Sequence, residues 1–234
     1  MDKAHRRDLK HDKFADQVGH GIEYAADHRS QVIKWGSIGL AAVVVVFGAY
    51  FYFDQQSANR AKDLTAAMRV QDAQIGPANA TEFLLTFPTQ PEKTAAAIKA
   101  FTSVMDKYPS KREGLIARFY LGVIYADNGK LAEAEAQWKP IAESSDADYA
   151  SQAKLSLGQL YETQNRTADA EKVLRSVVDH PTILVSKEQA TIALAHAIAH
   201  SKPEEARKLL EPLRTERAAV SRMAITAIGE LPQK

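Results

Sequence analysis

A near-constant period of 36 or 37 residues constrains the fold of this chain more than any other feature. Small residues recur at this spacing, and larger apolar residues follow each of them four and seven positions later. The small residues are Ala97, Ala134, Ala170 and Ala206; the larger ones are Phe101, Trp138, Leu174 and Leu210, then Val104, Ile141, Val177 and Leu213. Offsets of four and seven lie on one face of an α-helix. The period therefore predicts an array of similar helical units.

The two central units also share their first helices. Leu121, Gly122 and Tyr125 recur 36 residues later as Leu157, Gly158 and Tyr161. We expect the two glycines, faced by Ala134 and Ala170, to let the paired helices approach closely. Gly129 and Asn165 occupy equivalent turns, and both residue types tolerate the left-handed conformation that follows many helix ends. Pro109 and Pro181 close two of the second helices, because proline cannot continue a helix.

This pattern resembles the tetratricopeptide repeat, which residues 115–148 and 151–184 match best, although Arg118 and Lys154 stand where the repeat has a tryptophan. The resemblance implies an α-solenoid. No strand is apparent, and a last apolar helix, stopped by Gly229, would cap the array. The predicted fold class is all-α: a single transmembrane helix followed by a tetratricopeptide-like α-solenoid of three to four helix pairs with a C-terminal capping helix.

A run of 19 uncharged residues, 35–53, is bounded by Lys34 and Asp54. As a helix it would span about 28 Å, which matches the hydrocarbon core of a bilayer. Aromatic residues at its end and the 34 residues before it argue against a cleaved signal peptide. Seven Lys or Arg precede the run, against three in the 34 residues after it. This bias predicts a cytoplasmic N-terminus and an exported C-terminal region.

The chain is therefore expected to have four segments. Residues 1–34 form a cytoplasmic tail with a short amphipathic helix, 35–53 the transmembrane helix, 54–91 a juxtamembrane helix and connector, and 92–234 the repeat domain. This plan resembles the bacterial ancillary subunit of the SecYEG translocon, a family with relatives in cell-division coordination. The resemblance implies a single-pass protein of the bacterial inner membrane whose repeat domain lies in the periplasm.

Neither the composition nor the motifs of the chain indicate a catalytic function. Lys plus Arg number 30 against 29 Asp plus Glu, so the chain lacks the basic field that nucleic-acid binding needs. Without cysteine there is no thiol nucleophile and no Cys-ligated metal. His196 and His200 have ligand spacing but no third ligand, and Glu133, Glu135, Glu204 and Glu205 suit the starts of second helices. We therefore predict no catalytic, cofactor-binding or metal-binding residues, no cofactor, and no enzyme.

The inner face of such an array, lined by the first helix of each pair, is the expected binding surface. The candidate groove residues are Phe119, Val123, Gln152, Leu155, Gln159 and Glu162. For Phe119 and Leu155, simple packing between helices is an equal alternative.

The sequence thus favours a membrane-anchored interaction module that binds a protein or an extended peptide. It would assist protein export or periplasmic chaperone networks at the translocon, with translocon subunits and periplasmic chaperones as partners. The lipid bilayer would contact residues 35–53, and nucleic acid would not be a partner. The alternatives are a scaffold for cell-envelope or cell-division machinery and, from a different class, an enzyme with an unrecognised site.

Overall fold

The computed structural model describes residues 28–76, 85–216 and 218–232. The chain divides into two compact units, Met1–Ala58 and Asn59–Lys234. The amphipathic helix expected in the tail falls on residues outside the described ones. Within the described ranges the fold is all-α apart from one two-residue ladder, as the sequence predicts.

Helix α3 (Arg29–Gln71) contains the expected membrane span. Among the residues that the structure describes, it is the one helix long and apolar enough to cross a bilayer, and its apolar stretch is entirely exposed. Trp35, Leu40, Phe47 and Phe53 each leave more than half of their surface uncovered. A continuous apolar surface of this kind needs a nonaqueous partner. Its length and composition fit a membrane anchor or a signal sequence.

The segment after α3 contains two short strands that the sequence does not predict. Strands β1 (Gln74–Ile75) and β2 (Thr86–Phe87) pair in parallel, with Gln74 opposite Thr86. The expectation of no strand is therefore wrong at this point. A two-residue strand is too short to show the alternation of apolar and polar residues by which strands are recognised.

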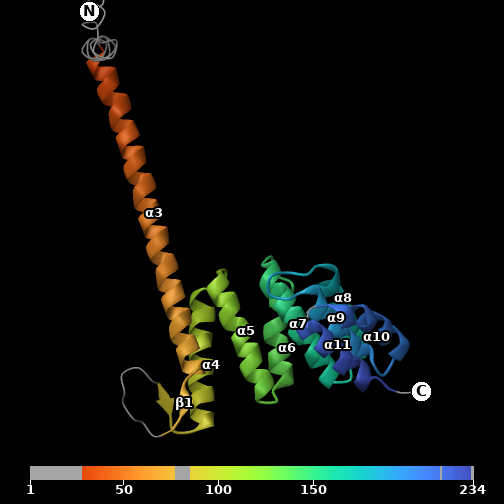
Figure 1. Cartoon of the computed structure of the whole chain (residues 1–234). Coiled ribbons are helices and arrows are strands. Elements are labelled where there is room, and N and C mark those ends of the chain that lie inside the picture. The colour runs from red at the N-terminus through yellow and green to blue at the C-terminus, as the bar shows by residue number, and fades with distance from the viewer. Residues whose placement is uncertain (1–27, 77–84, 217, 233–234) are drawn as a thin grey trace, which may run out of the picture. The chain divides into compact units, whose positions relative to one another are not determined.

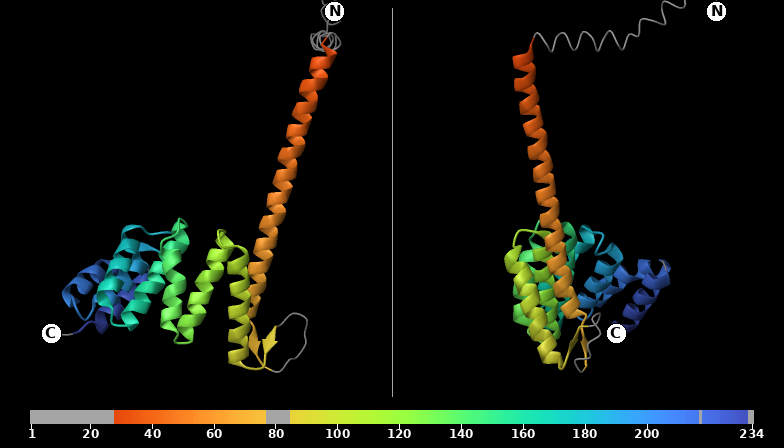
Figure 2. Two further views of the ribbon diagram at one scale, coloured as in Figure 1. Left: turned by 180° about the vertical axis from the view of Figure 1, so that it is seen from behind. Right: turned by 90° about the vertical axis from the view of Figure 1, so that its left-hand side faces the viewer.

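The rest of Asn59–Lys234 is a series of helices, each packed against the next (Figure 1). They are α4 (Gln90–Lys107), α5 (Arg112–Asp127), α6 (Leu131–Ala142), α7 (Ala147–Thr163), α8 (Thr167–Asp179), α9 (Lys187–Ile198), α10 (Pro203–Leu210), the 3-10 helix η1 (Glu211–Thr215) and α11 (Ala218–Glu230). Among the first helices, α7 also contacts both α5 and α9. The left view of Figure 2 follows the series from α4 to the C-terminal helices. This is the predicted array of helix pairs.

Local chemistry at the helix ends explains the boundaries. Thr89 caps the start of α4: its Oγ1 accepts a hydrogen bond from the Glu92 amide, and its hydroxyl donates to Glu92 Oε1. At the equivalent ends of α5 and α7, Gly129 and Asn165 adopt φ values of 72° and 58°. Both turns carry the same bond from the next residue's amide back to a tyrosine carbonyl, at 2.9 Å and 2.8 Å. The predicted left-handed turns are thus confirmed.

The core of the array consists of the periodic residues. All four alanines of the period are at most 1% exposed, and the residues four positions later are buried as well. Of the third set, Val104, Ile141 and Val177 are buried, but Leu213 is only half-buried. Helix α10 ends at Leu210, and Leu213 lies in the 3-10 turn that follows. At the C-terminus, Gly229 lies inside α11, which continues to Glu230, so the expected stop at Gly229 is wrong.

Two equivalent carboxylates join neighbouring repeats. Glu135 pairs with Lys139 one turn later and with Arg166 of the next repeat, at 2.8 Å and 2.9 Å. Thirty-six residues on, Glu171 pairs in the same way with Arg175 and with Lys202, at 2.6 Å and 2.7 Å. We call these two sets of contacts the carboxylate ladder. Each set of contacts joins the start of one second helix to the turn that precedes the following second helix. The carboxylate ladder therefore fixes how neighbouring repeats stack.

The ladder lowers the pKa of both carboxyl groups. For Glu171, hydrogen bonds from Lys202 and Arg175 lower the pKa. For Glu135, burial acts to raise the pKa, but hydrogen bonds from Lys139, Arg166 and Tyr161 outweigh it, and the net pKa is also lowered. Since the folded carboxyls have lower pKa values than unfolded ones, their contribution to stability is present at neutral pH and is lost in acid.

Replacing both Glu135 and Glu171 with glutamine should therefore lower the free energy of unfolding at pH 7 by about 1 kcal/mol per site. The difference from the parent should shrink as the pH falls below the ordinary glutamate value of 4.5, because the parent then loses the same interactions. Urea unfolding of the full chain in detergent at pH 7 and pH 3.5 measures both quantities. Glu133→Gln, at an exposed position of the same helix, is the control. A deficit unchanged at pH 3.5 would contradict this account.

Candidate protein-binding face

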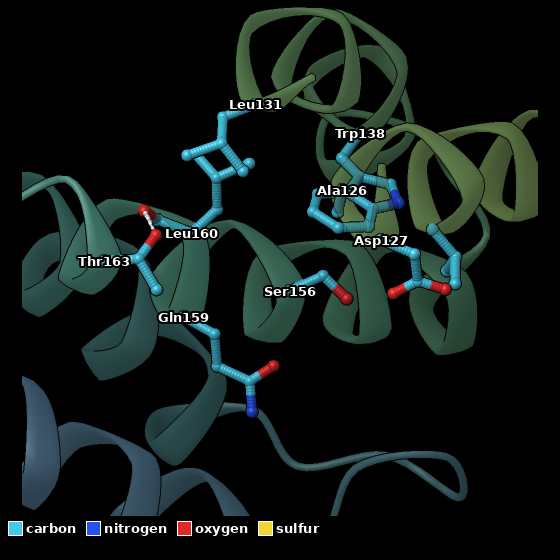
Figure 3. Close-up of a pocket in the computed structure, with 9 residues that line it drawn as sticks. Ala126, Asp127, Leu131, Trp138, Ser156, Gln159, Leu160 and Thr163 are labelled. Atoms are coloured by element: carbon cyan, nitrogen blue, oxygen red, sulfur yellow. Dashed lines mark hydrogen bonds between the residues drawn. The ribbon is translucent and has the colours of Figure 1, made fainter. Parts of the chain in front are cut away.

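A pocket of about 350 Å³ lies between α5, α6 and α7 (Figure 3). It is lined by Val123, Ala126 and Asp127 from α5, Leu131 and Trp138 from α6, and Ser156, Gln159, Leu160 and Thr163 from α7. Two of these three helices are first helices of their pairs, so the pocket lies on the face where the tetratricopeptide-like pattern places binding residues. Its size is that of sites that take one or two side chains or a small molecule.

The pocket has one apolar and one polar side. In Figure 3 the Trp138 ring and the side chains of Leu131 and Leu160 lie along one side, and the polar ends of Asp127, Ser156 and Gln159 lie along the other. Trp138 is only 5% exposed, and its Nε1 donates a 3.1 Å hydrogen bond to the Phe119 carbonyl. The apolar side therefore has a fixed surface, which suits recognition of an apolar side chain.

Gly122 allows this arrangement. A Cβ atom at position 122 would lie 2.6 Å from Cε2 of Trp138 and closer still to Nε1, far inside normal contact. The absence of a side chain thus lets the indole lie directly on the backbone of α5. The equivalent Gly158 accommodates Leu174 in the same way, with a Cβ-to-Cγ distance of 2.5 Å. The expectation that both glycines permit close helix approach is confirmed.

The structure brings together two of the six residues that the sequence singles out. Val123 and Gln159 both line the pocket. Gln152 is half-buried on α7, outside the pocket lining. Glu162 is exposed and lines a second, smaller pocket of about 170 Å³, between α7, α9, α10 and α11.

Phe119 and Leu155 occupy more interior positions. Leu155 is 3% exposed and belongs to the main hydrophobic core. Phe119 is half-buried, and its ring centroid lies 6.1 Å from those of Trp138 and Tyr149. For these two residues the structure matches the alternative of packing between helices. Phe119 nevertheless supports the pocket, since its carbonyl accepts the bond that orients Trp138.

Apart from Trp138, sequence reasoning missed six lining residues, which are Ala126, Asp127, Leu131, Ser156, Leu160 and Thr163. Helical periodicity could have indicated four of these residues. Ala126 and Asp127 follow Val123 by three and four residues. Ser156 precedes Gln159 by three residues, and Thr163 follows it by four. Trp138 is different: it is a core residue by its place in the period, and only the packing shows that it also borders a pocket.

The second pocket contains the histidines noted in the sequence. His196 and His200 line it together with Glu162 and Glu230, and His196 Nδ1 lies 3.9 Å from a Glu230 oxygen. Within the described parts of the chain, no group of three His, Asp or Glu side chains is arranged to hold a metal ion. The two histidines therefore belong to a second, more polar pocket between α7, α9, α10 and α11.

The fold and the pocket described first define an α-helical repeat protein of packed helix pairs with a pocket between α5, α6 and α7. Comparison with protein families agrees: the profile of the tetratricopeptide repeat-like domain matches residues 29–181, more than half of the chain. The chain belongs to this family. Such domains generally bind proteins or peptides and are typically non-catalytic. Neither the curated proteins nor the solved structures provide a match to this chain.

Proposed function

We propose that this chain is a single-pass protein of the bacterial inner membrane whose repeat domain, in the periplasm, binds protein segments and assists their export. The observation that carries the proposal is the pocket on the first-helix face of a tetratricopeptide repeat-like array. Its fixed apolar side and polar rim suit a polypeptide partner. The entirely exposed apolar stretch of α3 supports a membrane anchor.

The proposed role at the translocon rests on the resemblance of this plan to the ancillary SecYEG subunit. Partners would be translocon subunits, periplasmic chaperones and chains that emerge from the translocon. The segments 1–34, 35–53, 54–91 and 92–234 would serve as tail, anchor, connector and binding domain. Because the binding domain carries no cysteine, it suits an oxidising compartment.

A photo-crosslinking residue placed at Val123 or Gln159 of the full chain in native membranes tests the binding face. We expect adducts with translocon subunits or exported chains. The same crosslinker at Lys172 or Arg207, which are exposed on the second helices α8 and α10, should give few adducts. Adducts from the second helices alone would place binding elsewhere, and adducts with division proteins would favour the scaffold alternative.

The orientation can be tested on its own. Protease added to spheroplasts should digest the region after the span and leave residues 1–34 intact, because the Lys and Arg bias of seven to three favours a cytoplasmic N-terminus. Immunoblots against tags at each end report the outcome, with a cytoplasmic protein as the integrity control. A protected C-terminal region would overturn both the orientation and the export proposal.

A further inference from the structure

We infer that the pocket between α5, α6 and α7 recognises an apolar side chain followed by a cationic one, a leucine-lysine or leucine-arginine step in the partner. This inference rests on the proposed function and specifies its ligand. The apolar side of the pocket is built by Trp138, Leu131 and Leu160. The cation would meet the carboxylate of Asp127 at the polar side.

The Asp127 carboxylate is available to pair with a cation from a binding partner. It is exposed, it is the single charged residue of the pocket lining, and within the described residues no cationic side chain pairs with it. Elsewhere in the array many carboxylates are paired, as in the carboxylate ladder and between Glu113 and Arg60. An unpaired carboxylate beside an apolar pocket therefore provides charge complementarity for a basic ligand.

Helix polarity adds to this negative charge. Asp127 is the last residue of α5, and Glu162 lies one residue before the end of α7. The C-terminal end of a helix carries partial negative charge, so a carboxylate there is unfavourable for the helix itself. Helices α4 and α6 have Lys107 and Lys139 in their last turns, whereas α5 and α7 have no basic residue there. The end of α5 at the pocket thus presents a carboxylate and the negative end of a helix, which together attract a cation, whereas Glu162 lies at the second pocket.

The probe is a set of nine-residue Gly/Ser peptides with a central photo-leucine followed by lysine, glutamate or serine. The diazirine of photo-leucine is itself the apolar side chain, so the adduct reports where that side chain lies. The full chain in detergent is irradiated with each peptide, and adducts are located by mass spectrometry. We expect adducts within residues 121–163, about fivefold more with the lysine peptide than with the glutamate peptide, as for one partly exposed ion pair.

Variants of Asp127 test the charge. Asp127→Asn should reduce the lysine preference to below about twofold, and Asp127→Lys should reverse it. Glu143→Gln is the matched control, because Glu143 is also an exposed carboxylate at a helix end but lies outside the pocket. Circular dichroism should show parent-like helix content for all three, since both positions are exposed.

Each contrary result has a definite meaning. Equal labelling of the pocket by lysine and glutamate peptides would overturn the cation inference and leave the binding face in place. Labelling outside residues 121–163 would overturn the pocket assignment. If no peptide labels the chain while crosslinkers at Val123 and Gln159 capture export proteins in membranes, the inference fails and the proposed function stands. A crosslink from Gln159 that joins two copies of the chain would identify a second copy as the occupant and overturn the inference.

Discussion

Replacing Gly122 with leucine is expected to lower the free energy of unfolding of the repeat region by about 3 kcal/mol or more. Even a methyl group at this position would overlap the indole of Trp138. The indole cannot move away without loss of its hydrogen bond to the Phe119 carbonyl, and it is buried in the core. Denaturant unfolding of the full chain in detergent, followed by circular dichroism, measures the loss.

Two further glycines extend this test. Gly158→Leu should have a similar cost, since its side chain would enter the space of Leu174. Gly114→Ala should also destabilise strongly, because its Cβ would collide with the backbone carbonyl of Tyr108, which cannot rotate away as a side chain can. Gly229→Ala is the control: it is exposed inside α11 with nothing nearby, so it should be neutral or slightly stabilising. If the leucine variants unfold like the parent, the helix pairing is wrong.

Replacing Val44 and Val46 together with lysine should release the chain from the membrane fraction. Each charged side chain near the centre of a span costs about 3 kcal/mol of insertion free energy. Two such charges, about 6 kcal/mol in total, should abolish stable insertion of a single helix. Both valines are exposed in the structure, so the change removes no internal packing. Alkaline carbonate extraction followed by immunoblotting measures the fraction retained.

The matched control places two lysines on the same helix beyond the apolar run. Gln55→Lys with Ala58→Lys adds the same charge at exposed positions of α3 and should leave the chain in the membrane pellet. A Val44→Lys, Val46→Lys variant that still resists carbonate would contradict the membrane-span assignment. Cleavage of the parent near residue 53, detected by N-terminal sequencing, would instead identify the segment as a signal sequence.

The helix pairs could be predicted because each depends on short-range periodicity. The periodic alanine of each second helix and the apolar residues four and seven positions later are all within two turns of one another, so their shared face is visible in the sequence. The left-handed turns at Gly129 and Asn165 could be predicted for the same reason, because residue type and place in the period agree.

Features that join distant segments could not be predicted. Glu135 and Arg166 are 31 residues apart, and their pairing depends on how one repeat stacks on the next. Sequence reasoning therefore assigned Glu135 only to the helix dipole. Gly114 differs in that its close contact is local, with the Tyr108 carbonyl six residues earlier, but no periodic pattern marks this contact. The places of Val123 and Gln159 in the pocket lining could be predicted from their positions in the repeats. The packing that brings Trp138 to the border of the pocket could not.

The carboxylate ladder also has a consequence for the C-terminal end of the array. Counting 36 residues back from Glu135 gives Lys99, and counting 36 forward from Glu171 gives Arg207. Both are exposed cations at the position where the inner repeats have a carboxylate acceptor. Each ladder carboxylate joins its own repeat to the following one, so Lys99 belongs to the internal contact of α4 with the next repeat. Arg207 leaves the C-terminal end of the array without the group that would hold a further repeat in register. At the C-terminal end, the carboxylate that unites the inner repeats is therefore replaced by a cation, which discourages the end-to-end addition of a second copy of this translationally repetitive structure.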